Sequence, residues 1–241
     1  KNYDEALKIY KELYEENPNS FDGYNMAYCL NKLKRYKEAV QFSEQLYGSY
    51  PDDKWVKRIY TQSLFLGKVS RKSSEFSDHD LKKNIKKIIE LEEQDEDSPF
   101  WSSRAILQGM GHFSTHGQWE SVHDLSKLKD WTLFDKNPNK YKGKTWMSDR
   151  ENWYLKAAKA SFKLKKWDEC NAVSKRGFEE FPKNIWLKRD YAISLGHIGN
   201  PTEAIKLLND VLKIKKDWFI HMDIADMYIL EPNLNQAKEI L

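Results

Sequence analysis

Apolar and polar residues recur along this chain with the spacing of amphipathic helices, which bury one face and expose the other. A stripe near residues 79–95 contains Leu81, Ile85, Ile88, Ile89 and Leu91, all on one side of the predicted helix. A weaker pair of helices is predicted near 101–113 and 118–128. The first part of the chain is predicted to form helices near 3–16, 20–33, 36–49 and 53–66.

A short tract at the head of alternate helices repeats with a nearly constant period. Ala6 and Ala39 end two copies and are 33 residues apart, and Ala237 lies 33 residues beyond Ala204. A period near 34 fits two helices and two short turns, and small residues are needed where the helix axes approach closely. The four copies are Tyr3-Asp4-Glu5-Ala6, Tyr36-Lys37-Glu38-Ala39, Trp167-Asp168-Glu169-Cys170 and Pro201-Thr202-Glu203-Ala204. We call the last residue of each tract, and Ala237, the anchor. Another small residue stands twelve positions before four of these anchors, at Ala27, Ala158, Ala192 and Ala225.

These recurring positions resemble those of the tetratricopeptide-repeat (TPR) family. The resemblance covers residues 1–66 and 149–241 well and residues 98–130 loosely. It implies an all-α fold, a right-handed α-solenoid of about six helix pairs with one irregular central section. Such repeats are a scaffold, so the resemblance implies a fold more strongly than a function.

Two segments interrupt the pattern and suggest the domain organisation. Residues 68–78 are polar and are expected to form a loop, and the helix that follows lacks the small anchor residue. We predict an N-terminal array over 1–130 that is irregular from residue 67, a linker or bend over 131–147, and a C-terminal array over 148–241. One continuous solenoid and two separate arrays both remain open. Because the chain starts without Met and ends within a predicted helix at 233–241, we expect it to be a piece of a longer protein.

Composition excludes several classes of protein. The chain of 241 residues has only 10 Gly and 7 Pro, which argues against a Rossmann-like enzyme with glycine loops. No apolar run approaches the roughly 18 residues that a membrane span needs. No nucleophile elbow, phosphate loop or zinc-protease motif occurs, so we predict no enzymatic activity and no cofactor. Cys29 and Cys170 fall on inward faces and are predicted to be small core residues. Without a signal-peptide pattern, a cytoplasmic location is expected.

One cluster has the residue types of a metal site at helical spacing. His112, His116, Glu120 and His123 could ligate Zn²⁺ if three or four of them converged. Gly117 falls in the turn between the two helices, so the two pairs of side chains need not share a face. The favoured interpretation is a packed and solvated helix hairpin without a metal.

The resemblance also implies a binding surface, because the first helices of TPR pairs line a concave groove. This surface mixes aromatic and cationic groups and would suit a peptide, a helix or a partner domain. We expect Arg58 and Arg189 to be anchors whose replacement weakens binding and leaves the fold intact. Tyr24 and Tyr28 stand where some relatives carry a carboxylate clamp, so that clamp is expected to be absent. The groove residues are predicted to be Tyr24, Tyr28, Asn31, Trp55, Arg58, Gln62, Lys159, Phe162, Lys163, Trp186, Arg189, His197, Met222 and Asp226.

Two alternative functions remain open at this point. The repeats could be a regulatory segment of a larger multidomain enzyme or of a defence or signalling protein. They could also bind nucleic acid through the Lys-rich stretches 136–144 and 163–167, which include Tyr141 and Trp167. The net charge of +3, from 40 basic and 37 acidic residues, does not favour a dedicated nucleic-acid binder. The acidic tract 90–97 could pair with the basic stretch 136–144, although most such runs are simply solvated.

Overall fold

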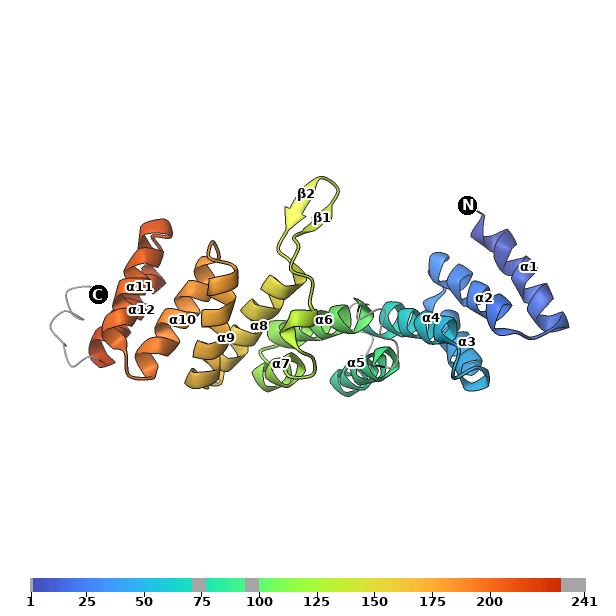
Figure 1. Ribbon diagram of the computed structural model, residues 1–241, viewed down its shortest axis with the longest axis horizontal. Helices are drawn as coiled ribbons and strands as arrows, with labels where there is room; N and C mark the ends of the chain where they lie inside the picture. The colour runs from blue at the N-terminus through green and yellow to red at the C-terminus, as the bar shows by residue number, and fades with distance from the viewer. Residues whose placement is uncertain (1, 71–76, 94–99, 231–241) are drawn as a thin grey trace. The chain divides into compact units, whose positions relative to one another are not determined.

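The computed structural model describes residues 2–70, 77–93 and 100–230 (Figure 1). The predicted helix at 233–241, its anchor Ala237, and parts of the loop 68–78 and of the acidic tract 90–97 lie outside the described residues. The chain divides into two compact units, residues 1–112 and residues 113–241, called the N-terminal and C-terminal units below. The predicted boundary at 131–147 stays a prediction.

The N-terminal unit is helical and confirms the helices predicted for the start of the chain. Asn19 and Asp53 cap α2 and α4, because their side-chain oxygens accept hydrogen bonds from backbone N–H groups of the first turn. Helix α2, the first helix of its repeat pair, packs on α1, on α3 and on α4, which is the first helix of the next pair. The elements are α1 (Tyr3–Glu16), α2 (Ser20–Lys32), α3 (Tyr36–Ser49), α4 (Lys54–Leu64), the π-helix η1 (Phe65–Val69), α5 (Asp78–Glu92) and α6 (Phe100–Thr115), which runs three residues past this unit.

The C-terminal unit repeats the same arrangement. Each helix from α8 onward packs on its successor, and α10 also packs on α8 and on α12. First helices therefore contact first helices, which is the packing of an α-solenoid and confirms that part of the predicted fold class. No helix among the described residues is long and apolar enough to cross a membrane. The helices are α7 (Trp119–Ser126), α8 (Asp149–Lys163), α9 (Trp167–Glu180), α10 (Ile185–His197), α11 (Pro201–Ile214) and α12 (Trp218–Leu230).

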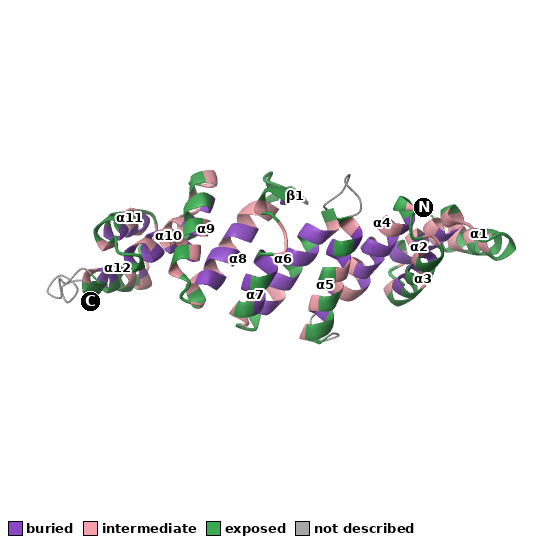
Figure 2. Ribbon diagram, turned by 60° about the horizontal axis from the view of Figure 1, so that its bottom comes forward, coloured by how far each residue is buried: buried purple, intermediate pink, exposed green. Residues whose placement is uncertain are grey.

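The small residues predicted at the helix crossings are buried, which confirms the register of the repeat. Ala39, Cys170 and Ala204 on second helices are fully buried, and so are their counterparts on first helices. Figure 2 shows that buried positions lie along the sides of helices that face neighbouring helices. In the C-terminal unit one core cluster surrounds Ala192 and Ala204 and includes Ile193, Ile205, Leu208, Val211, Ile220, Ile224 and Met227.

Four of the turns inside helix pairs contain one residue with left-handed backbone geometry. Lys34, Gly117, Lys165 and Gly199 have φ values of 60°, 70°, 56° and 100°. Each stands five residues before the anchor position of the next helix, which in α7 is occupied by Val122. In each turn the next N–H donates to a carbonyl five residues back, as Lys166 does to Ser161 at 2.9 Å. This is the Schellman geometry that ends a helix, and it favours glycine.

Replacing Lys165 with glycine should therefore stabilise the protein, by about 0.5–1 kcal/mol, since a side chain in the left-handed region is disfavoured. Lys165 is exposed, so removing its side chain loses little packing. The matched control is Lys163→Gly in the last turn of α8, which should destabilise by about 1 kcal/mol. Urea denaturation measures both variants, and equal effects in the same direction would contradict the explanation.

Residues 131–147, predicted to be a linker or bend, hold ordered structure. A 3₁₀ turn (Trp131–Leu133) precedes a hairpin of β1 (Asn139–Tyr141) and β2 (Lys144–Trp146), in which Asn139 pairs with Trp146. Lys142 and Gly143 form its two-residue loop, both with positive φ, as a type I′ turn requires. Sequence reasoning did not anticipate these strands, because Lys-Gly is a weaker hairpin signal than Asn-Gly.

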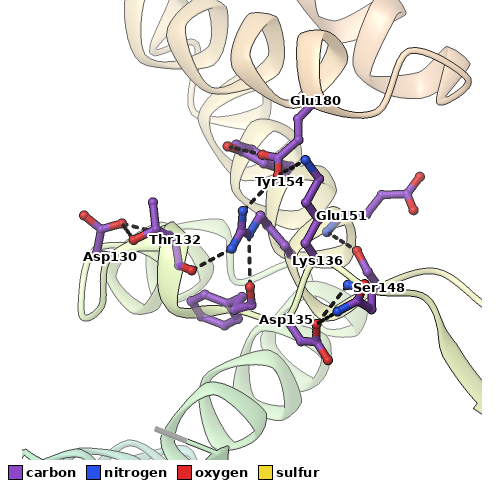
Figure 3. Close-up of polar contacts among 11 residues, drawn as sticks. Asp130, Thr132, Asp135, Lys136, Ser148, Glu151, Tyr154 and Glu180 are labelled. Atoms are coloured by element: carbon purple, nitrogen blue, oxygen red, sulfur yellow. Dashed lines mark hydrogen bonds and ion pairs between the residues drawn. The ribbon is translucent and has the colours of Figure 1, made fainter. Parts of the chain in front are cut away.

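Arg150 on α8 holds this segment against the helices. Its guanidinium donates to the carbonyl oxygens of Phe134 (3.0 Å) and Thr132 (2.6 Å) and pairs with Glu180 of α9 at 2.9 Å. Figure 3 shows Tyr154 and Lys136 directed toward the same Glu180 carboxylate. The segment is thus tied to α8 and α9 by directional bonds.

Candidate functional site

The predicted groove residues of the N-terminal unit gather on α2 and α4. The ring of Tyr24 stacks beside Tyr28 at 6.3 Å and meets Trp55 edge-on at 6.1 Å. The guanidinium of Arg58 lies 5.1 Å from the Trp55 ring, and Lys32 lies 5.0 Å from the Tyr28 ring. We call Tyr24, Tyr28, Trp55 and Arg58 the N-terminal aromatic surface, which offers flat rings and cations together.

The cap of α4 sets the direction of two of these side chains. Asp53 accepts hydrogen bonds from the N–H groups of Trp55 (2.8 Å) and Val56 (3.2 Å). The helix therefore begins with Trp55 in its first turn, where the side chain is 54% exposed. Arg58 follows three residues later on the same face, which brings it over the indole ring.

A pocket of about 320 Å³ opens beside this surface. Four predicted residues line it, and so do six that sequence reasoning missed. Among the missed residues, Trp101 of α6 packs against Phe65 at 5.0 Å, and Glu92 accepts hydrogen bonds from the N–H groups of Trp101 and Ser102. An aromatic residue at the second position of a first helix recurs at Trp55, Trp101 and Trp186, and this recurrence was the available signal. The predicted lining residues are Tyr24, Trp55, Arg58 and Gln62, and the missed ones are Lys57, Ile59, Thr61, Leu91, Glu92 and Trp101.

Asn31 does not join this surface. Its side chain is buried, with 5% exposed, and its amide donates to the hydroxyl of Ser63 at 2.9 Å. Asn31 follows the small buried residue Ala27 by four residues, which places it on the inward side of α2. Asn31 therefore links α2 to α4 through a hydrogen bond in the interior of the protein.

The C-terminal unit has a comparable surface across α8, α10 and α12. Trp186 stacks on Phe219 at 6.0 Å, and the guanidinium of Arg189 lies 5.3 Å from Phe219 and 6.0 Å from Phe162. Lys159 approaches the Phe162 ring at 5.7 Å. We call Phe162, Trp186, Arg189 and Phe219 the C-terminal aromatic surface. Sequence reasoning missed Phe219, which is the aromatic residue at the second position of α12.

Arg189 forms an ion pair inside the C-terminal unit. Its Nε and Nη2 donate to the two carboxylate oxygens of Asp223, at 2.5 and 2.7 Å, and both side chains are only 13% exposed. Neighbouring Asp190 is 4% exposed, and burial raises its pKa to about 6, partly offset by the charge of Arg189. Arg189 therefore has a structural role, and we no longer expect its replacement to leave the fold intact.

The remaining predicted residues are exposed on the C-terminal unit. The ring of His197 stacks on Trp167 at 3.8 Å, and burial lowers the pKa of this histidine. The other three residues are also exposed. They are Lys163 on α8, Met222 on α12 and Asp226 on α12.

Two histidines of the candidate metal cluster, His112 and His123, link helices. His112 lies 2.8 Å from Asp78 of α5, and His123 lies 2.8 Å from Glu169 of α9. Hydrogen bonds from Lys127 and His123 lower the pKa of Glu169 to about 2. Among the described residues, no three His, Cys, Asp or Glu side chains are placed to hold a metal ion.

Both cysteines are buried, as predicted. Burial raises the pKa of the Cys29 thiol, and it raises that of Cys170 to about 12. A thiol in this state is not an activated nucleophile, because the thiolate is the reactive species. The prediction that Cys29 and Cys170 are core residues is confirmed.

Comparisons with known proteins agree with the resemblance drawn from the sequence. Residues 1–62 match a family model described as tetratricopeptide repeat. The C-terminal part of a TPR repeat-containing protein from Cytophaga hutchinsonii superimposes with a TM-score of 0.51 and 11% identity, over 99% of this chain and 89% of that chain. That likeness shows a shared fold. A search of curated proteins finds no match.

Two further solved structures are more distant. YrrB, described as a TPR protein with an unusual peptide-binding site, gives a TM-score of 0.44 at 11% identity, with 98% of this chain and 90% of that chain covered. The human IFIT1 dimer with m7Gppp-AAAA gives 0.41 at 17% identity, with 99% of this chain covered. This chain spans 53% of the IFIT1 chain.

Proposed function

We propose that this chain, a TPR-family helical repeat, binds a partner protein through the N-terminal aromatic surface on α2 and α4. TPR repeats in general are protein-interaction scaffolds and are generally not enzymes, which agrees with the absence of catalytic motifs from the sequence. The proposal goes further, because it assigns binding to particular side chains and to one pocket.

The observation that carries the proposal is the pocket itself. Its volume of about 320 Å³ lies within the range of ligand clefts, and Tyr24, Trp55 and Trp101 give it apolar walls. Lys57 and Arg58 add positive charge to its lining, whereas the carboxylate of Glu92 is occupied by hydrogen bonds from backbone N–H groups. These walls suit an aromatic or aliphatic side chain of a peptide or helix, followed by an acidic residue that pairs with Arg58.

Site-specific photo-crosslinking, carried out in cells of the organism that makes the protein, tests this proposal. A benzophenone amino acid replaces Gln62, which lines the pocket, or Lys37, which is exposed on α3 and does not line it. We expect a partner adduct from position 62 and not from position 37. Purification of that adduct identifies the partner for affinity measurements.

Trp55→Ala and Arg58→Ala should each weaken binding of that partner at least about ten-fold, as expected for anchor residues that a bound partner covers. Arg35→Ala is the matched control: it also removes a guanidinium, but Arg35 pairs with exposed Glu38 and lies outside the pocket. The control should change affinity less than about two-fold. Equal adducts from both positions, or equal affinities for all three variants, would overturn the proposal.

A further inference from the structure

A second and larger groove lies between α3 and α5. Its volume is about 810 Å³, and no residue that lines it also lines the first pocket. The two cavities use different sides of α4: Arg58 and Gln62 face the first, whereas Tyr60 and Leu64 face the second. We call this cavity the lysine groove, after Lys68, Lys82, Lys83, Lys86 and Lys87 in its lining.

The lining of the lysine groove carries a net positive charge. Five lysines face two acidic residues, Glu44 and Glu90, an excess of three positive charges with His79 neutral. The formal net charge of the whole chain is also +3, so outside this groove the basic and acidic residues balance. A cleft lined by one sign of charge concentrates ligands of the opposite sign.

The lysines of α5 lie at spacings that bring like charges close together. Lys82 and Lys86, and likewise Lys83 and Lys87, are four residues apart, a spacing at which like charges destabilise a helix. Acidic residues of α5 offset part of this repulsion, because Lys87 pairs with Glu90 at 3.8 Å and the charge of Lys83 acts on Asp80. An anion in the groove would relieve the part of the repulsion that these pairs leave.

The floor of the groove is apolar and favours a peptide over a nucleic acid. Val40, Tyr60 and Leu64 are buried, and Tyr60 is only 3% exposed, with its ring stacked on Tyr47 and its hydroxyl donating to Glu44. Stacking of bases needs an exposed aromatic ring, and Tyr60 does not offer one.

We propose that the lysine groove is a second docking surface, which binds an acidic peptide segment of a partner protein. Carboxylates of the segment pair with the lysines of α5, and an apolar side chain between them contacts Val40 and Leu64. This inference goes beyond the function proposed above, because it concerns a different face of α4 and a ligand that carries several carboxylates.

The test uses the whole chain and a fluorescein-labelled peptide of repeated Glu-Glu-Leu, with fluorescence anisotropy as the readout. We expect the peptide to bind, a Gln-Gln-Leu peptide to bind at least about ten-fold more weakly, and affinity to fall with salt. The variant Lys83→Glu/Lys86→Glu/Lys87→Glu should lose at least about ten-fold in affinity. Trp55→Ala should leave it unchanged, which separates this test from that of the first pocket.

The matched control is Lys175→Glu/Lys183→Glu/Lys216→Glu, which changes the net charge equally at exposed positions of the C-terminal unit. It should reduce affinity less than about two-fold at moderate salt. Melting curves of both triple variants check that they fold. The proposal fails if the acidic peptide does not bind, if both triple variants lose affinity equally, or if oligouridine binds the groove more tightly than the peptide.

Discussion

Replacing Arg189 with alanine should lower the free energy of unfolding by about 3 kcal/mol. The guanidinium and the Asp223 carboxylate form two hydrogen bonds and are both largely removed from water. Without Arg189, the carboxylate of Asp223 would remain buried with its charge uncompensated, and burial already raises its pKa. The charge of Arg189 also favours ionised Asp190, so the variant should raise the pKa of Asp190 further.

Urea denaturation at neutral pH measures this effect, with Lys188→Ala as the matched control on the same helix. Lys188 also pairs with an aspartate across helices, at 3.0 Å, but Asp210 is 46% exposed. Its loss should therefore change stability by less than about 1 kcal/mol. If both variants lose the same stability, the Arg189–Asp223 pair has no more effect than a surface ion pair.

Asp190→Asn should stabilise the protein at about pH 8, by up to about 3 kcal/mol, because the native state then no longer holds a buried ionised carboxylate. Burial raises the pKa of Asp190 from 3.8 to about 6 in the folded state. The folded state therefore binds the proton more tightly than the unfolded state. The stability of the parent protein falls as the pH rises between these two values, and the full penalty is present above about pH 6.

The measurement compares denaturation curves of the parent and Asp190→Asn at about pH 4 and pH 8. The advantage of the asparagine should nearly vanish at the lower pH, where the native carboxyl is protonated. Asp226→Asn is the control, because that carboxylate is exposed on α12 and its replacement should change stability by less than about 0.5 kcal/mol at either pH. An advantage of Asp190→Asn that is independent of pH would show that ionisation is not its cause.

Sequence reasoning predicted most of the helices, because their anchors are small residues with few alternative roles. Ala39 and Ala204 had to be buried at a helix crossing, and both are fully buried. Residues 131–147 lack such a period, and the bonds that order them come from Arg150 and Glu180, which lie outside that segment. Long-range side-chain bonds of this kind leave no local pattern.

The candidate site was predictable where it follows the repeat and not where it depends on side-chain direction. Trp55 and Arg58 share the spacing of Trp186 and Arg189, so both pairs were found. The sequence did not reveal that one arginine lies over a tryptophan, whereas the other pairs with a carboxylate 34 residues away. That separation equals one repeat, and a search for opposite charges one period apart would have found Asp223.

The left-handed turns also bear on how such a chain can be recombined. Because Lys34, Gly117, Lys165 and Gly199 share one backbone geometry at one place in the repeat, the chain path at each of these positions is interchangeable. A hybrid joined at any two of them would keep the hydrogen bonds of the turn and the distance to the next anchor. These turns are therefore natural junctions, at which whole helix pairs can be inserted, removed or exchanged with the register of the array preserved.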